Sequence, residues 1–402
     1  MEATTVVAAA VVPEPEIPDG LTPSEEDELA EPSEDEGESH EVDGSVENGV
    51  RYSAELSDQE LTELWAKTPD ALGSISIGFV DEGRIVNAYQ FPPGEGYVVV
   101  QPEKAWATRE TVQAVIAAIT EVKRQHPDAP ALRVNQLSGA EGGHLRPHKS
   151  HQNGRDVDLG FYYPTAETNR AREREKYIDP ARNWALLKAL VTQTDVQMIL
   201  VDRRVQKVIY DHALSVGEDK AWLDSLFRAG TQSIIRHARR HRDHFHVRFY
   251  NARAQELGRR VAPLLAMRPE QNLRMHRVRK GDTLGGIAVR YGTTVSSIKK
   301  ANRMRSSFLR ISQVLRVPLR GPCTRCPIPP AVQVPPRRLP PGFNEAQQVA
   351  QGRSVVAAPA EEVAEVTQSQ SVQAVAAEVS DSAEDTAPVV VPAVLRPLPG
   401  PR

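Results

Sequence analysis

The chain has 402 residues and a formal net charge of −4, and this length allows two or three domains. The charge is distributed unevenly. Residues 21–48 contain twelve Asp or Glu and no Lys or Arg, whereas residues 274–320 contain twelve Lys or Arg and a single acid, Asp282. Because no run of eighteen apolar residues occurs, the sequence predicts no membrane span.

Both ends of the chain are predicted to be disordered. Residues 1–49 are acidic and have little to bury, and residues 320–402 are rich in Pro, Ala, Val and Gln without helical or strand periodicity. The first residues include a short apolar run but no basic segment before it, which is not typical of a secretory signal. Cys323 and Cys326, the only cysteines, form one CxxC, for which a disulfide or two plain thiols is favoured over a metal site.

Residues 50–262 are expected to form an α+β domain with a central, mostly antiparallel sheet. Ser57 and Glu60 have the spacing of a capping box, which predicts a helix over 57–65. Thr108 is expected to cap a second helix, and Trp184 lies in a third. Short β-prone runs predict strands at 74–79, 84–86, 96–100, 198–201 and 208–210.

A second, smaller unit is expected at residues 276–319, after a linker at 263–275. Its predicted order is a strand at 276–279, helices at 284–291 and 295–302, and a strand at 314–317. Gly292 is expected to end the first of these helices. The sequence therefore predicts a compact βααβ domain.

Metal-capable side chains concentrate in two stretches. EGGHLRPHKSHQNGRDVDLGFYY at 141–163 places three histidines and two aspartates around Gly154, and HRDHFHVRFY at 241–250 adds three further histidines. Each stretch continues into an apolar, β-prone run, so the polar residues are expected at the ends of two strands. The residues concerned are His144, His148, His151, Asp156, Asp158, His241, His244 and His246.

Two imidazoles and one carboxylate on adjacent strands predict a three-ligand zinc site with one position open for water. Such a zinc ion lowers the pKa of its water to about 7 and polarises a carbonyl. Spacing does not decide which histidine of the second stretch binds the metal. We assign His246 to the zinc with His151 and Asp158, and His244 to catalysis as a base or an oxyanion stabiliser.

The remaining polar residues are weaker candidates. His241 is expected to take part in catalysis or to orient a neighbouring histidine. His148 and His144 are candidates for a further ligand or for lining the site. Asp156 fits an orienting role and a plain salt bridge equally well, because Asp156 and Asp158 alternate along one strand and share a face.

SHQNGRDVDL together with DHFHVRF closely resembles the penicillin-insensitive murein endopeptidases, within the group that includes lysostaphin-like and D-Ala-D-Ala metallopeptidases. The resemblance covers about residues 72–257. It implies zinc held by His151, Asp158 and His246, catalysis by His244, and His148 and His241 lining the site. It also implies cleavage of D-alanyl–meso-diaminopimelyl amide cross-links in the periplasm or cell envelope.

The smaller unit resembles a LysM domain through KGDTL, IAVRYGTTVSSIKKAN and LRVP. That resemblance implies binding of glycans that contain N-acetylglucosamine. Peptidoglycan is therefore the expected partner of both domains, by its peptide cross-links and by its glycan strands, and nucleic acid is not expected.

Other functions remain open at this point. A D,D-carboxypeptidase of the same group and a non-catalytic wall-binding protein with a structural metal are both compatible with the residues. A non-haem iron oxygenase is disfavoured, because its first His and carboxylate are commonly separated by one residue and here six intervene. The basic residues 274–320 alone would also suit nucleic acid, which the LysM pattern disfavours.

Overall fold

The computed structural model describes residues 50–51, 56–166, 171–322 and 328–343. Residues 1–49, the CxxC and most of the C-terminal tail lie outside these ranges, so the disorder predicted for them and the state of Cys323 and Cys326 stay predictions. The predicted α+β class is confirmed. No helix among the described residues is long and apolar enough to cross a bilayer.

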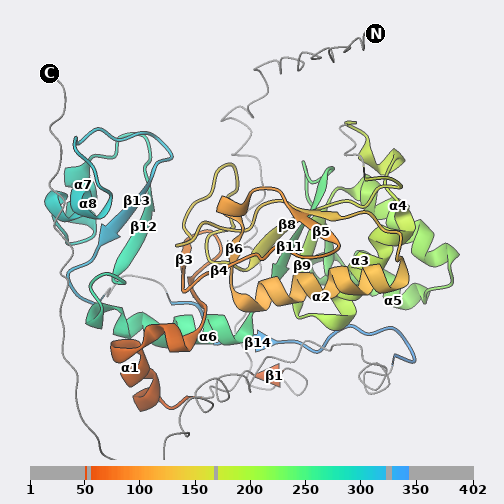
Figure 1. Cartoon of the computed structure of the whole chain (residues 1–402), viewed down its shortest axis with the longest axis horizontal. Helices are drawn as coiled ribbons and strands as arrows, with labels where there is room; N and C mark the ends of the chain where they lie inside the picture. The colour runs from red at the N-terminus through yellow and green to blue at the C-terminus, as the bar shows by residue number, and fades with distance from the viewer. Residues whose placement is uncertain (1–49, 52–55, 167–170, 323–327, 344–402) are drawn as a thin grey trace, which may run out of the picture. The chain divides into compact units, whose positions relative to one another are not determined.

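Most of the helices and strands are labelled in Figure 1. The α-helices are α1 (Asp58–Lys67), α2 (Arg109–Gln125), α3 (Pro180–Gln193), α4 (Arg203–Ser215), α5 (Lys220–Phe227), α6 (Ala252–Val261), α7 (Leu284–Arg290) and α8 (Val295–Ala301). Short 3-10 helices are η2 (Pro69–Leu72), η3 (Pro102–Lys104), η4 (Arg174–Lys176), η5 (Gly230–Gln232) and η6 (Ala262–Met267).

A six-stranded sheet forms the centre of the larger domain. Its order is β10 (Ile235–His237), β9 (Val196–Val201), β11 (His244–Phe249), β8 (Asp156–Gly160), β7 (Leu132–Val134) and β5 (Tyr97–Val99). The pairs β9–β11, β11–β8 and β8–β7 are antiparallel, and β10–β9 and β7–β5 are parallel. The sheet is therefore mostly antiparallel, as predicted.

Two-stranded ladders make up the remaining strand pairs of the described residues. They are β1 (Val50–Arg51) with β14 (Gln333–Val334), β2 (Ile75–Gly78) with β3 (Gly83–Val86), β4 (Tyr89–Gln90) with β6 (Trp106–Ala107), and β12 (Leu273–Arg277) with β13 (Val314–Pro318).

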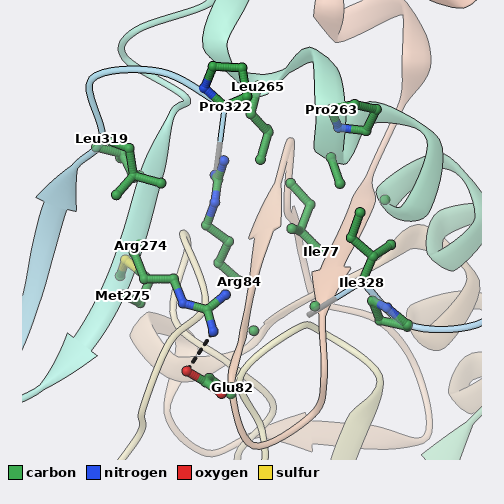
Figure 2. A pocket seen from close by; sticks show the side chains of 16 residues that line it. Ile77, Glu82, Arg84, Pro263, Leu265, Arg274, Met275, Leu319, Pro322 and Ile328 are labelled. Atoms are coloured by element: carbon green, nitrogen blue, oxygen red, sulfur yellow. Dashed lines mark ion pairs between the residues drawn. The ribbon is translucent and has the colours of Figure 1, made fainter. Parts of the chain in front are cut away.

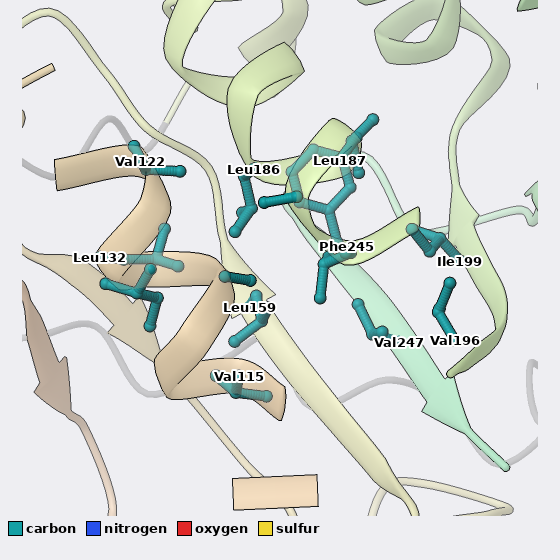
Figure 3. Packing of buried hydrophobic residues seen from close by; sticks show 14 of the residues in the cluster. Val115, Val122, Leu132, Leu159, Leu186, Leu187, Val196, Ile199, Phe245 and Val247 are labelled. Carbon is teal, nitrogen blue, oxygen red and sulfur yellow. The ribbon is translucent and has the colours of Figure 1, made fainter. Parts of the chain in front are cut away.

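The main hydrophobic core covers one face of the central sheet. Alternate residues of β8 and β11 belong to it, and Figure 3 shows Leu159, Phe245 and Val247 directed towards side chains of α2 and α3. Successive side chains of a strand point to opposite faces. The polar residues that alternate with these apolar ones therefore lie on the other face of the same two strands. They are Asp156 and Asp158 of β8 and His244, His246 and Arg248 of β11.

The predicted helix caps are confirmed, and one predicted strand is wrong. Ser57 and Glu60 form the predicted capping box of α1, and Thr108 accepts a hydrogen bond from the backbone N–H of Thr111 at the start of α2. The predicted strand at 208–210 is wrong, because these residues belong to α4. Its buried face repeats at helical spacing, through Val205, Ile209 and Ala213, and this longer pattern prevails over three β-prone residues.

The predicted linker and part of the predicted disordered tail contain regular structure. Residues 263–275 contain η6 and the start of β12, because Leu264 and Leu265 pack beside Trp65 in a second apolar cluster. Residues 328–343 of the predicted disordered tail include β14. There the Arg338 carbonyl accepts a hydrogen bond from the Trp222 indole, and the Arg338 guanidinium donates to the Ser225 carbonyl.

The smaller unit is the predicted βααβ domain, β12–α7–α8–β13. Thr283 and Thr294 cap its two helices, and Leu284, Ile287, Ile298, Leu315 and Val317 lie in its core. Ion pairs join it to the larger domain, between Arg274 and Glu82 at 2.5 Å and between Arg316 and Glu141 at 2.8 Å. Figure 2 shows the first of these pairs beside an apolar cavity of about 170 Å³ that Ile77, Leu265 and Met275 help to line.

Candidate metal centre

Strands β8 and β11 bring the two polar stretches together. Their antiparallel register places His246 opposite Asp158, and both side chains are buried. The His246 Nδ1 lies 3.2 Å from the Asp158 Oδ1, and the His151 Nε2 lies 3.2 Å from the same oxygen and 3.1 Å from the His246 Nδ1. Three ligand-type atoms from two stretches that are far apart in sequence therefore converge on one point.

His151 reaches this point from the loop before β8. Its backbone has a positive φ of 65°, a conformation that residues other than glycine rarely adopt and that clusters at functional sites. The Nδ1 is 2.6 Å from the Leu137 carbonyl and donates to it, which fixes the tautomer and directs the Nε2 towards Asp158. Three residues later Gly154, with φ of 79°, makes the predicted bend, where a Cβ would lie 2.5 Å from Ile85.

His148 is a further neighbour of the same carboxylate. It can place a ligand atom within 4.8 Å of those of His151 and Asp158. Its Nε2, however, is 3.6 Å from the Asp158 Oδ2 and only 2.7 Å from the Gln136 Oε1. His148 thus has a hydrogen-bond partner already, whereas the buried Nε2 of His246 has none among the described residues.

His244 and His241 lie at the entrance of the cluster. The His244 Nε2 is 3.7 Å from the Asp158 Oδ1, and its Nδ1 is 2.8 Å from the Asp243 Oδ1. The ring of His241 lies 4.9 Å from that of His244 and 5.8 Å from that of His246, measured between centroids. Both side chains are only partly exposed, so each can face the cluster and solvent together.

Asp156 forms a buried ion pair. Its carboxylate accepts hydrogen bonds from the Arg248 guanidinium at 2.7 and 3.2 Å, and it also accepts one from the backbone N–H of His151 at 3.1 Å. The contact with Arg248 fits the predicted salt bridge, and the contact with the His151 backbone fits the predicted orienting role. His144 lies half-buried at the start of the same loop and stays a candidate.

The electrostatics of the cluster favour a cation at its centre. Burial raises the pKa of Asp158, but His151 and His244 outweigh this effect and hold it well below its usual range. Burial lowers the pKa of His151, but the charges of Asp158 and Asp156 and the hydrogen bonds to Asp158 and the Leu137 carbonyl together outweigh burial, and the net shift is upward. Burial and then the charge of His151 lower the pKa of His148 to about 3. A buried, ionised carboxylate among imidazoles is a donor set that fits a metal ion.

Comparison with known proteins assigns the two domains. Residues 76–264 match the penicillin-insensitive murein endopeptidase family. Residues 276–318 match the LysM domain family. Both resemblances predicted from the sequence are thereby confirmed.

The curated relatives match a short part of this chain. The "LysM and putative peptidoglycan-binding domain-containing protein 2" of Mus musculus is 42% identical over 59 residues, 14% of this chain and 27% of that protein. The human protein of the same name is 44% identical over 45 residues, 11% of this chain and 21% of that protein. The chain thus spans about a quarter of the length of these relatives.

Sequence reasoning missed three residues that support the cluster. Asp243 contacts His244, Gln136 contacts His148, and Arg248 neutralises Asp156. Asp243 could have been found, since it directly precedes His244 in the motif. Arg248 could also have been found, because in DVD and HFHVR the charged residues alternate with apolar ones on both strands. Gln136 precedes the motif and carries no such signal.

Proposed function

We propose that this protein is a zinc-dependent murein endopeptidase that hydrolyses D-alanyl–meso-diaminopimelyl amide cross-links. The observation that carries the proposal is the convergence of the His151, His246 and Asp158 ligand atoms within 3.2 Å inside a domain that matches this family. The site of action is the cell envelope, where that substrate lies.

His151, Asp158 and His246 are proposed as the zinc ligands. The Leu137 carbonyl supports His151 in the way that backbone carbonyls orient metal-bound imidazoles. His148 is a weaker ligand candidate, because its Nε2 is engaged with Gln136. We assign it to the wall of the site.

A zinc ion at this position supplies a Lewis acid for the scissile carbonyl and lowers the pKa of a water molecule. We assign to His244 the movement of a proton between water and the leaving amine. In support, its Nε2 lies 3.7 Å from the Asp158 Oδ1, and its Nδ1 contacts the Asp243 carboxylate. His241 lies next to His244 and is assigned to orienting it or to stabilising charge on the reacting amide.

The LysM domain is proposed to hold the enzyme on glycan strands that contain N-acetylglucosamine. Binding through a second domain raises the local concentration of cross-links at the active site.

The test uses the full chain loaded with zinc and a purified cross-linked muropeptide dimer of the diaminopimelate type. Mass spectrometry should detect monomers from the wild-type protein. The monomers should disappear with a chelator, with Asp158→Ala and with His244→Ala. Zinc content should fall in Asp158→Ala and stay near one per chain in His244→Ala, because only the first removes a ligand.

Other outcomes would contradict the proposal. Intact dimers with one zinc per chain would exclude the endopeptidase. Release of terminal D-Ala from single stems would then identify a D,D-carboxypeptidase, and unchanged binding of sacculi without any product would identify a wall-binding protein.

A further inference from the structure

A basic hollow lies beside the metal centre. It has a volume of about 560 Å³ and is formed by the first turn of α4 and the loop after β10. One acidic residue, Asp202, is among those that line it. The others are Arg203, Arg204, Lys207, His237, Arg239 and Arg240.

The positive charge of this basic hollow is only partly neutralised by its surroundings, where Asp211 pairs with Lys207. Arg203 and Arg239 are exposed, and neither has an ion-pair partner among the described residues. The carboxylate of Asp202 caps α4 by accepting a hydrogen bond from the backbone N–H of Arg204 at 2.9 Å, and it lies 3.7 Å from the Arg204 guanidinium. Asp202 is therefore shared between a helix cap and Arg204, and the excess of positive charge rests on Arg203 and Arg239.

The position of these cations weakens the fold locally. Arg203 and Arg204 occupy the first turn of α4, where the helix dipole disfavours positive charge. Arg240 has a positive φ of 69°, which is costly for a residue with a Cβ. Basic residues placed where they oppose local stability favour an anionic ligand over a merely solvated surface.

The basic hollow is tied to the metal centre by its backbone. The carbonyl of His241 accepts a hydrogen bond from the N–H of Asp202 at 2.7 Å, and the His241 ring lies 3.0 Å from the Arg239 carbonyl through its Nδ1. The N–H of Arg203 donates to the His237 Nδ1 at 3.1 Å. Because the His241 ring also lies 4.9 Å from that of His244, His241 connects the segments that line the hollow to the cluster.

We propose that this basic hollow binds the free carboxylate on the diaminopimelyl side of the cross-link. The inference rests on the proposed function. In such a cross-link, the carbon that carries the scissile nitrogen also carries a carboxylate. A substrate whose amide lies at His244 therefore presents an anion next to the reacting bond, on the side from which the amine leaves. Guanidinium groups are suited to it, because they form paired, charge-assisted hydrogen bonds with carboxylates.

The test compares two muropeptide dimers that differ only in this group, one with the carboxylate and one with a carboxamide. The wild-type protein should cleave the carboxylate dimer with kcat/KM about tenfold higher, the size expected for one charge-assisted hydrogen bond at a partly exposed site. The variant Arg203→Gln/Arg239→Gln should lose this preference and cleave the carboxamide dimer at the wild-type rate. Arg203→Lys/Arg239→Lys should keep part of it, and Lys220→Gln, which removes an exposed cation of α5 outside the hollow, should behave as wild type.

Two results would overturn the proposal. One is equal cleavage of both dimers by the wild-type protein. The other is an equal loss on both dimers in Arg203→Gln/Arg239→Gln, which would indicate a general effect on the site.

A binding measurement distinguishes failure of the proposed function from failure of the inference about the hollow. The affinities of both dimers for the His244→Ala variant are measured by calorimetry, in the presence and absence of Arg203→Gln/Arg239→Gln. If the wild-type protein cleaves neither dimer but the carboxylate dimer binds more tightly through these arginines, the carboxylate site in the hollow is supported and the endopeptidase assignment is contradicted. If neither cleavage nor binding distinguishes the dimers, the hollow does not bind this carboxylate.

Discussion

The two faces of strands β8 and β11 differ in chemistry, although alternate residues of the same two strands form them. On one face Val157, Leu159 and Val247 are fully buried in the main core. On the other face Asp158 and His246 are almost as deeply buried, but they contact charged and polar atoms. Burial therefore does not distinguish core from site in this sheet.

The difference lies in what stabilises each face. Apolar side chains gain free energy from burial itself, whereas a buried carboxylate is stable only if it is paired. Arg248 supplies that pairing for Asp156, and imidazoles surround Asp158. The polar face should thus depend on its partners one by one, and the apolar face should depend on volume.

The largest effect on stability is expected from breaking the buried ion pair. Arg248→Met should lower the free energy of unfolding by about 3–5 kcal/mol, because it leaves the Asp156 carboxylate buried without its partner. The measurement is urea unfolding followed by tryptophan fluorescence. All four tryptophans precede residue 223, so the signal reports the larger domain and not the LysM domain.

The double variant Asp156→Leu/Arg248→Met is the control. Since it removes both charges, it should recover part of the lost stability. If the single and double variants are equally unstable, packing rather than charge pairing explains the loss.

A smaller effect is expected on the apolar face. Leu159→Ala should cost about 2–4 kcal/mol through lost burial and the cavity that remains. The zinc content and kcat of the folded fraction should stay close to wild type, because Leu159 and Asp158 point to opposite faces. A loss of zinc in Leu159→Ala at temperatures where the protein is folded would show that the two faces are not independent.

The sequence predicted the chemistry of both faces better than the supporting contacts. Alternation in DVDLG and HFHVRF placed Asp158 and His246 on one face, and the structure puts them opposite each other in the register. The α+β class followed from the same patterns. Local signals such as the Ser57–Glu60 capping box were also sufficient, because all the atoms involved are within four residues.

Contacts between distant segments were not predictable from a single chain. Residues 208–210 of α4 predict a strand when taken alone, because a window of three residues does not reveal a helical face. The order of residues 328–343 depends on Trp222 and Ser225, more than a hundred residues earlier. Gln136 likewise contacts His148 from twelve residues earlier in the chain, and no local pattern links the two.

The smallest effect is expected where the polar face reaches solvent, at the pair Asp243 and His244. The Asp243 Oδ1 is 2.8 Å from the His244 Nδ1, and the aspartate side chain is about half exposed, at 49%. Asp243→Asn should lower kcat about tenfold by leaving the ring of His244 less firmly oriented, with KM and zinc content nearly unchanged. Steady-state kinetics on the muropeptide dimer, with Glu63→Gln as a control for the loss of one exposed negative charge, provide the measurement. A change in KM alone would assign Asp243 to substrate binding, and no change in either constant would mean that packing alone orients His244. A fall in kcat at constant zinc content would show that the dependence on single partners, expected for the buried polar residues, also holds at the exposed edge of this face. There, too, one specific partner would hold a polar side chain in place.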